Sequence, residues 1–237
     1  MHIKIMSYNT QSCQNYITDK IDFDAVVNAI KECKADIIGL QEIRDESENE
    51  VFEAQARILA EKLGFYFYFA EAIRFSGENP YGNALLSRYP IVTAETVLIP
   101  DPEVKGYDGY YETRCVLIAT IDVGCLLHVA VSHFGLNPDE QINAINTVMN
   151  NVREESFVLM GDFNMEPDNP MLQPIKQCLY DTADIFSAPK LSFPADDPQV
   201  KLDYIFVSKD LKVSDADIPT IMTSDHRPYV ITIEMKD

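Results

Sequence analysis

Five short apolar runs in this chain border polar residues of the kinds that bind metal ions or phosphate groups. Short continuous apolar runs are typical of buried β-strands. A carboxylate, an asparagine or a histidine beside such a run lies at the rim of a sheet, where a ligand can reach it. The five runs are residues 3–6, 37–40, 126–131, 157–160 and the run that begins at Tyr229.

The residues that border these runs form one chemical set. They combine carboxylates, neutral amides and imidazoles, which suits a hard divalent cation with oxygen ligands beside a phosphoryl group. A single border of this kind carries little information, whereas five of them predict one site assembled from distant segments. The bordering residues are Asn9, Glu42, His133, Asp162, Asn164, Asp225 and His226.

The composition is that of an ordinary soluble globular protein. Of the 237 residues, 46% are hydrophobic and 24% are charged. No stretch approaches the length of a transmembrane segment. Because no linker, repeat or low-complexity segment interrupts the chain, we predict one domain that spans residues 1–237.

The net charge of −19 bears on possible partners. The chain has 19 basic and 38 acidic residues and no basic cluster. Affinity for nucleic acid depends largely on Lys and Arg side chains that neutralise phosphates. The charge therefore disfavours a nucleic-acid partner, although solubility alone also explains an acidic surface.

The five cysteines are odd in number and scattered, and no CxxC motif occurs. This pattern favours reduced, mostly buried thiols over a disulfide or zinc framework. The N-terminus enters strand-like sequence at once, which leaves no room for a signal peptide. Together these features predict a cytoplasmic protein.

The hydrophobic pattern predicts many strands and few helices in a mixed order. We expect two sheets packed face to face with helices outside them, a layered α/β sandwich. Helices are predicted over residues 24–34, 50–63 and 137–152, the last with an apolar face of Ile142, Ile145, Met149 and Val152. Further strands are predicted over residues 65–69, 84–86, 91–98, 113–122, 125–131, 203–207 and 229–234, with a hairpin at Val123-Gly124.

Asp162 and Asn164 stand two residues apart after the run 157–160. In an extended chain they project to the same side, while Phe163 points into the core. Asp162 can then touch a metal or align a water, and the Asn164 amide can donate to a phosphate oxygen. The alternative is a Gly-Asp turn that simply closes a strand.

His226 can act on a phosphate as a donor or proton carrier, because its ordinary pKa lies near 6.5. Asp203 begins an apolar strand and could fix the tautomer of His226 by accepting its Nδ1 hydrogen. Asp225 could bind the metal or hold another imidazole. An acid at a strand start remains the alternative for Asp203.

Four further residues carry weaker signals. Glu42 is a candidate metal ligand or an exposed glutamate, and Asn9 is a candidate ligand or a turn residue. His133 is a second candidate histidine or a satisfied core or loop histidine. Arg114 could face a substrate phosphate in bidentate fashion or form an exposed salt bridge.

Taken together, these motifs resemble those of the endonuclease/exonuclease/phosphatase superfamily, the deoxyribonuclease I-like fold. Their order and spacing match over nearly the whole chain. The resemblance implies a four-layer α/β/β/α sandwich of two packed mixed β-sheets, with the site at one end of both sheets. The motifs are Ser7-Tyr8-Asn9, Gln41-Glu42, residues 82–91, Ser132-His133-Phe134, Gly161-Asp162-Phe163-Asn164, Leu202-Asp203-Tyr204-Ile205 and Ser224-Asp225-His226-Arg227-Pro228.

The resemblance implies a metal shell and a catalytic pair. Glu42 corresponds to the principal Mg²⁺ ligand, with Mn²⁺ as a substitute, and Asn9 and Asp225 correspond to its neighbours. Asp162 and Asn164 correspond to the pair that positions nucleophile and phosphate.

The resemblance also implies two histidine roles. His226, oriented by Asp203, corresponds to the base or phosphate-binding imidazole. His133 matches a histidine of the deoxyribonuclease I-, sphingomyelinase- and phosphatase-like branches that the abasic-site endonuclease branch lacks. Asn83 and Arg114 match auxiliary substrate-binding positions.

The leading hypothesis is a metal-dependent hydrolase of phosphate esters, either a phosphodiesterase or a phosphatase. Because the chain is short and has no tryptophan or long aromatic hairpin, we expect a phosphorylated small molecule or lipid head group as substrate. The alternatives are a nuclease acting on DNA or RNA and a non-catalytic relative that binds metal or phosphate. Related sites share one core chemistry, so the sequence does not identify the substrate.

Overall fold

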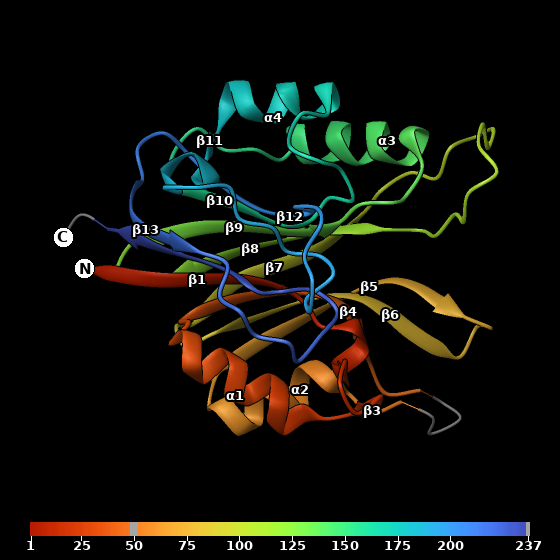
Figure 1. The fold of residues 1–237 in the computed structure, drawn as a ribbon, viewed down its shortest axis with the longest axis horizontal. Coiled ribbons are helices and arrows are strands. Elements are labelled where there is room, and N and C mark those ends of the chain that lie inside the picture. Colours follow the sequence, from red (N-terminus) through yellow and green to blue (C-terminus); the bar gives the residue numbers. More distant parts are fainter. Residues whose placement is uncertain (48–51, 236–237) are drawn as a thin grey trace.

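A computed structural model describes residues 1–47 and 52–235 of the protein. Within these residues, two six-stranded mixed β-sheets pack face to face, and helices cover both outer faces (Figure 1). This arrangement confirms the predicted α/β/β/α sandwich. No helix in the described ranges is long and apolar enough to cross a membrane.

The first sheet has the strand order β13-β14-β1-β4-β6-β5. Helices α1 (Phe23–Cys33) and α2 (Gln55–Leu63) lie on its outer face (Figure 1). Its strands are β1 (His2–Asn9), β4 (Ile37–Arg44), β5 (Tyr66–Phe75), β6 (Asn79–Ser87), β13 (Lys212–Asp217) and β14 (Tyr229–Glu234).

The second sheet has the strand order β11-β12-β10-β9-β8-β7. Helices α3 (Pro138–Met149) and α4 (Gln173–Cys178) lie on its outer face (Figure 1). Its strands are β7 (Ile91–Leu98), β8 (Cys115–Asp122), β9 (Leu126–His133), β10 (Phe157–Asp162), β11 (Tyr180–Asp181) and β12 (Asp203–Val207). The smaller elements are β2 (Gln14–Asn15), β3 (Lys20–Ile21) and 3₁₀ turns over Gln11–Cys13, Pro170–Leu172 and Thr182–Ile185.

The central strands are buried on both faces. On β1, Ile5 packs into the core between the two sheets, and the next residue, Met6, packs under α1 and α2. On β10, Met160 faces the inter-sheet core, whereas Leu159 faces the core under α3 and α4. Because successive side chains of a strand point to opposite faces, burial of both faces requires a continuous apolar run rather than an alternating one.

Strand direction brings the ends of these runs together. β1 runs parallel to β4 and places Asn9 beside Gln41, one residue before Glu42. β10 runs parallel to β9 and places Asp162 beside His133. β12 is antiparallel to β10, so its first residue, Asp203, also lies beside Asp162. The carboxyl ends of four strands and the start of a fifth therefore meet at one end of the sandwich.

Several strands are longer than their apolar patterns predict. β5 and β6, expected over residues 65–69 and 84–86, extend into a hairpin whose outer pairs reach Phe75 and Asn79. β13 was not predicted at all, because it is an edge strand whose side chains are mostly exposed or half-buried. Strands β7, β12 and β14 have the predicted bounds. The β8–β9 hairpin turns at Val123 and Gly124 as expected.

The helices follow the predictions less closely at their ends. The structure begins α2 at Gln55, and the predicted residues 50–51 lie outside the described residues. α2 ends before Gly64, whose φ of 70° confirms the predicted stop. α3 is shorter than the predicted 137–152. Its predicted apolar face was wrong at Ile142, which is 50% exposed, because the buried face is rotated by one residue.

All five cysteines are free thiols. Three of them, Cys13, Cys33 and Cys115, are buried, and burial raises the pKa of Cys115 to about 12. Cys125 and Cys178 are exposed.

Candidate active site

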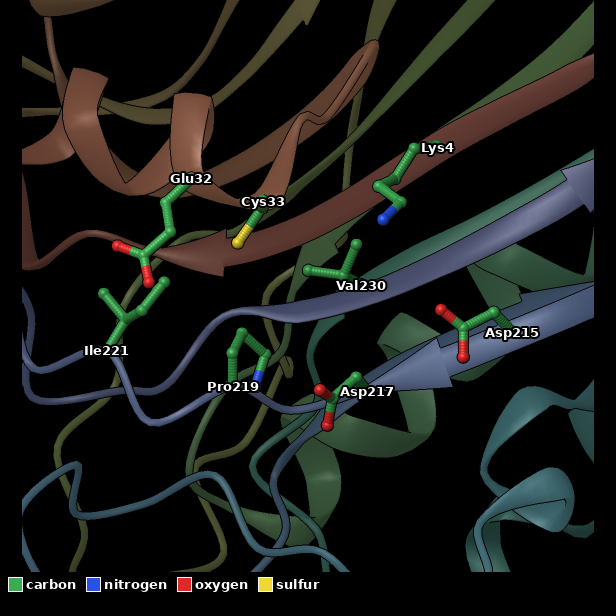
Figure 2. Close-up of a pocket in the computed structure, with 8 residues that line it drawn as sticks. All are labelled: Lys4, Glu32, Cys33, Asp215, Asp217, Pro219, Ile221 and Val230. Atoms are coloured by element: carbon green, nitrogen blue, oxygen red, sulfur yellow. The ribbon is translucent and has the colours of Figure 1, made fainter.

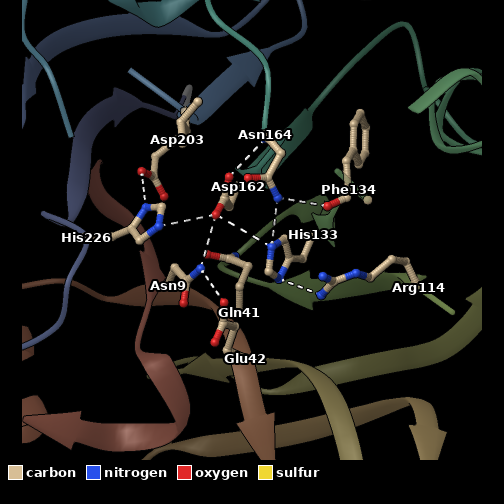
Figure 3. Close-up of polar contacts among 12 residues, drawn as sticks. Asn9, Gln41, Glu42, Arg114, His133, Phe134, Asp162, Asn164, Asp203 and His226 are labelled. Atoms are coloured by element: carbon tan, nitrogen blue, oxygen red, sulfur yellow. Dashed lines mark hydrogen bonds and ion pairs between the residues drawn. The ribbon is translucent and has the colours of Figure 1, made fainter. Parts of the chain in front are cut away.

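Side chains from β1, β4, β9, β10, β12 and the segment before β14 converge at one end of the two sheets (Figure 3). The structure thus brings together most of the predicted site residues, although they span the chain from Asn9 to His226. The converging predicted residues are Asn9, Glu42, Arg114, His133, Asp162, Asn164, Asp203 and His226.

Asp162 lies at the centre of this cluster and is 1% exposed. Its Oδ2 accepts a hydrogen bond from Asn9 Nδ2 at 3.1 Å and lies 3.5 Å from His226 Nε2 and 3.6 Å from His133 Nε2. Burial raises the pKa of the Asp162 carboxyl to about 6, against the opposing effect of His226. The carboxylate therefore titrates close to neutral pH.

His226 is held by two carboxylates. Its Nδ1 lies 2.9 Å from Asp203 Oδ2, as predicted, and the ring of Phe193 packs against the imidazole at 4.7 Å between centroids. Burial alone would disfavour the charged ring, but Asp203 and Asp162 outweigh it and raise the pKa of His226 to about 10. At neutral pH this histidine is an imidazolium that donates from Nδ1 to Asp203 and carries its second ring hydrogen on Nε2, 3.5 Å from Asp162.

The pKa of His133 is shifted in the opposite direction to that of His226. Burial and the positive charge of Arg114 hold the pKa of His133 well below its usual range. Arg114 Nη1 lies 2.9 Å from His133 Nδ1, and a guanidinium can only donate. We therefore assign the ring hydrogen to Nε2, which faces Asp162 and Asn164.

Arg114 forms a salt bridge with Glu112 at 2.8 Å, and both side chains are about nine-tenths buried. The prediction offered a phosphate contact or an exposed salt bridge. The salt bridge is present, but it is buried, because the guanidinium lies between Glu112 and His133. Glu112 was missed by the sequence reasoning, although an acidic residue two positions before Arg114 was an available signal.

Asn164 does not adopt the extended conformation that was predicted. Its φ is 50°, and its backbone N–H donates to Asp162 Oδ1 at 3.0 Å, which is a turn closed by the aspartate side chain. Its amide still points into the site, 3.1 Å from His133 Nε2, and donates to the Phe134 carbonyl. Phe163 packs inward as predicted and stacks on Phe134 with 4.2 Å between ring centroids.

Gly161 is required where β10 approaches β9. Its φ is 156°, and a Cβ atom there would lie 1.8 Å from the carbonyl oxygen of Ser132. The glycine lets the two strands approach closely, so that Asp162 can lie beside His133.

Glu42 does not end its strand, contrary to the prediction. β4 continues to Arg44, and its register with β6 shifts between Leu40 and Ile43. Glu42 lies inside this bulge with a φ of 59°, which turns its half-buried side chain toward the site. Its Oε1 accepts from Asn9 Nδ2 at 3.1 Å, and no other hydrogen bond or ion pair holds the carboxylate among residues 1–47 and 52–235.

Asn9 joins the two carboxylates through its amide nitrogen, which donates to both Glu42 and Asp162. Its Oδ1 accepts from the backbone N–H of Gln11 at 3.1 Å. In this structure Asn9 therefore orients the carboxylates with its nitrogen, whereas the predicted role as a metal ligand requires its oxygen.

Two predicted residues lie outside this network in the described part of the chain. The Asp225 carboxylate accepts from the Ser224 hydroxyl at 3.0 Å and raises the pKa of His226 only from a distance. Asn83 is 2% exposed, and its Nδ2 donates to the Cys115 carbonyl at 3.0 Å, a contact that links the two sheets. The predicted roles of these two residues stay predictions.

Two groupings of side chains could hold a cation. Asp162, Asp203 and His226 each offer a ligand atom within 4.8 Å of the others. The second grouping is the predicted one around Glu42. In the first grouping both carboxylates already contact the His226 imidazole, at 2.9 Å and 3.5 Å, whereas the Glu42 carboxylate accepts only from Asn9 within the described residues, so the Glu42 side is the better fit. Its carboxylate is the kind of oxygen ligand that Mg²⁺ prefers.

A separate hollow of about 200 Å³ lies beside β1, β13 and β14 (Figure 2). Its lining includes Lys4, which lies five residues before Asn9 on β1, together with Cys33 and Asp217. None of the predicted site residues lines it, so the candidate chemistry belongs to the cluster around Asp162.

The family model described as "Endonuclease/Exonuclease/phosphatase family" matches residues 6–226 of the chain. The chain belongs to this family. Endonuclease/exonuclease/phosphatase proteins hydrolyse phosphate esters. The match begins three residues before Asn9 and ends at His226, so it spans the whole cluster.

Relatives and solved structures extend over most of the chain. Uncharacterized protein YbhP of Escherichia coli K12 is 26% identical over 230 residues, which cover 88% of this chain and 87% of YbhP. A family structure from Leptotrichia buccalis has a TM-score of 0.78 and 22% identity, covering 98% of this chain and all of that one. A mannosyl-6-phosphatase from Bacteroides thetaiotaomicron has a TM-score of 0.78 and 17% identity, with coverage of 98% and 100%. At these identities the structural matches establish the shared endonuclease/exonuclease/phosphatase fold.

Proposed function

We propose that this protein is a magnesium-dependent hydrolase that cleaves a phosphate ester of a small or exposed substrate. One observation carries the proposal: Asp162 Oδ2 lies within 3.6 Å of His133 and His226, and Asp162 shares the Asn9 amide with the Glu42 carboxylate. Two imidazoles and a second carboxylate around one buried carboxylate are typical of a catalytic site rather than of a purely structural cluster.

The donors of the site suit a phosphoryl group. His226 donates as an imidazolium and His133 donates through Nε2–H, while Asn164 gives one amide hydrogen to the Phe134 carbonyl and keeps the other as a donor. A phosphate placed here would accept hydrogen bonds from these groups with its own oxygens, in place of the acceptors that they now contact. Donors fixed before the reaction stabilise charge that develops on those oxygens.

Asp162 is the proposed base. Its pKa of about 6 leaves it mostly ionised at pH 7, so it can take a proton from an attacking water. The water oxygen bonds to phosphorus as the ester P–O bond breaks, the leaving oxygen takes a proton from solvent and departs as the alcohol, and Asp162 returns its proton to solvent. His226 is already protonated and therefore serves as a donor to the phosphoryl oxygens rather than as the base.

Glu42 is the proposed principal ligand of Mg²⁺, and Asp225 is the proposed second ligand, because Asp162 serves as the base. When bound, Mg²⁺ supplies Lewis-acid stabilisation of the negative charge on the phosphate oxygens. Asn9 holds the Glu42 carboxylate in place through its 3.1 Å hydrogen bond.

A substrate panel tests this function. Purified protein is assayed with 4-nitrophenyl phosphate, bis(4-nitrophenyl) phosphate, sugar phosphates, glycerophosphodiesters, DNA and RNA, each with Mg²⁺, with Mn²⁺ and with EDTA. We expect hydrolysis of at least one small ester with either metal and none with EDTA. Folded protein that is inert on the whole panel, or activity that persists in EDTA, contradicts the proposal.

Two matched pairs of variants locate the chemistry. Glu42→Gln and His226→Ala should each lower kcat by about 10²-fold or more. Glu95→Gln and His2→Ala change the same residue types at exposed positions on other parts of the sheets and should retain wild-type rates. Equal rates for His226→Ala and wild type would exclude the assigned site.

A further inference from the structure

An open groove of about 670 Å³ lies directly beside Asn164. The residues that follow Asn164, up to Pro170, form one wall. Leu136 and Gln141, at the start of α3, form a second wall, and Val200 and Leu202, before β12, form a third. The volume falls in the range that small-molecule sites occupy, and it exceeds what a phosphate alone needs.

The groove offers mainly hydrogen-bond acceptors. Glu166 and Asp168 line it, are exposed, and form no ion pair within the described ranges. Gln141 donates its amide hydrogens to the carbonyls of Gly135 and Asn164, so its oxygen is left for a ligand. Asn169 accepts from Met171 N with its oxygen, so its amide NH₂ is left as a donor.

Among the described residues, no lysine or arginine lines this groove. Two lysines of the flanking segments lie near it but are held by other groups. Lys201 is 4% exposed, with Nζ 3.3 Å from the centre of the Tyr204 ring. Lys176 donates to the carbonyl of Pro167 at 2.7 Å. A second phosphate in the groove would therefore face Glu166 and Asp168 without a compensating cation.

The rest of the lining is apolar. Leu136 is 55% exposed at the groove, and Val200 and Leu202 are half-buried opposite it. Within residues 1–47 and 52–235, no aromatic side chain belongs to the lining. An aromatic cage, which binds quaternary ammonium groups, is thus missing from these walls.

We propose that this groove binds the alcohol part of the substrate and that this part is an uncharged polyhydroxylated group, a sugar or a polyol. Its hydroxyls donate to the carboxylates of Glu166 and Asp168 and accept from the Asn169 amide, while its C–H surface lies on Leu136. The inference rests on the proposed function, because the phosphate is placed at Asn164, on the border of the groove.

Steady-state kinetics with Mg²⁺ on four substrates tests this assignment. The substrates are a hexose 6-phosphate, the corresponding hexose 1,6-bisphosphate, phosphoethanolamine and 4-nitrophenyl phosphate. We expect kcat/KM for the hexose 6-phosphate to exceed that for the bisphosphate and for phosphoethanolamine by at least tenfold. The bisphosphate carries a second phosphate, which Glu166 and Asp168 would repel. Phosphoethanolamine carries an ammonium group, which the groove would prefer if the charge of these two carboxylates were its only means of recognition.

Variants connect this preference to the groove. The double variant Glu166→Gln/Asp168→Asn keeps the shape of both side chains and removes their charge. We expect it to lower the ratio of kcat/KM for hexose 6-phosphate to that for 4-nitrophenyl phosphate by at least fivefold, mainly through KM. Glu95→Gln, an exposed acid on β7, should leave the ratio unchanged.

The outcomes separate this inference from the proposed function. Preference for the bisphosphate or for phosphoethanolamine, or an unchanged ratio in the double variant, overturns the assignment of the groove while hydrolysis itself stands. Folded wild-type protein that hydrolyses none of the four substrates overturns the assignment of the groove, and inactivity on the whole panel of phosphate esters overturns the proposed function as well.

Discussion

Single residues decide the geometry of this site, and Gly161 is the clearest case. A Cβ there would meet the Ser132 carbonyl at 1.8 Å, whereas a Cβ at Gly64 would meet nothing within 4 Å. Both glycines have positive φ, so a comparison of the two separates backbone strain from the clash between strands.

We predict that Gly161→Ala lowers the free energy of unfolding by about 3–5 kcal/mol, the combined effect of strain and overpacking. Gly64→Ala, which suffers the strain alone, should lower it by about 1–2 kcal/mol. Urea unfolding followed by circular dichroism measures both. Equal losses in the two variants would contradict the close strand approach.

The charge of His226 makes a second prediction at this scale. Its pKa is raised from 6.5 to about 10 in the folded protein, so the folded state binds this proton more tightly than the unfolded state. The stabilisation is fully present below pH 6.5 and is lost as the pH rises toward 10.

Metal-free protein should therefore unfold at progressively lower urea concentration between pH 7 and pH 9.5. His226→Asn should show a shallower dependence on pH, because the other titrating groups are the same in both proteins. Parallel curves for the variant and wild type would show that His226 is not held as an imidazolium.

At the scale of structural elements, the segment before β8 contains a buried ion pair between Glu112 and Arg114, which the sequence did not predict. Arg114 Nη1 lies 2.9 Å from His133 Nδ1 and 2.8 Å from Glu112 Oε1, so one nitrogen contacts both residues. Removing one partner of a buried ion pair leaves an uncompensated charge, which is far more damaging than the loss of an exposed pair.

Glu112→Gln should therefore destabilise the protein by roughly 3 kcal/mol. Glu61→Gln removes the exposed Arg57–Glu61 pair of α2, and its effect should stay below about 0.5 kcal/mol. Thermal unfolding at low salt measures the difference. A Glu112 variant as stable as the Glu61 variant would argue that Arg114 needs no buried anion.

The apolar runs were sufficient to predict the central strands, because β1, β4, β9 and β10 are buried on both faces. Their polar borders predicted which residues meet, because parallel neighbours end at one edge. The bulge at Glu42 and the turn at Asn164 were not predictable, since both depend on a positive φ at a residue other than glycine. β13 lacked an apolar signal because it lies at an exposed edge.

For the molecule as a whole, the surplus of negative charge predicts a response to magnesium. The net charge is −19, and three of the acidic residues, Glu42, Asp162 and Asp203, lie together in the site near the protonated His226. A divalent cation bound only by the folded state stabilises that state by mass action.

Mg²⁺ at about 100 times its dissociation constant should raise the free energy of unfolding by about 2.7 kcal/mol. Glu42→Gln should lose most of this gain, and NaCl at equal ionic strength should not reproduce it. The melting temperature across a Mg²⁺ titration provides the measurement. An equal response to NaCl would mean general screening rather than a site.

The central claim is that Asp162 joins the metal side and the histidine side of one catalytic site. The most direct measurement is kcat at saturating Mg²⁺ for the best substrate of the panel, in wild type and in Asp162→Asn, with folding of both checked by circular dichroism. We expect Asp162→Asn to lower kcat by about 10²-fold or more. Wild-type turnover by a folded Asp162→Asn variant would contradict the central claim.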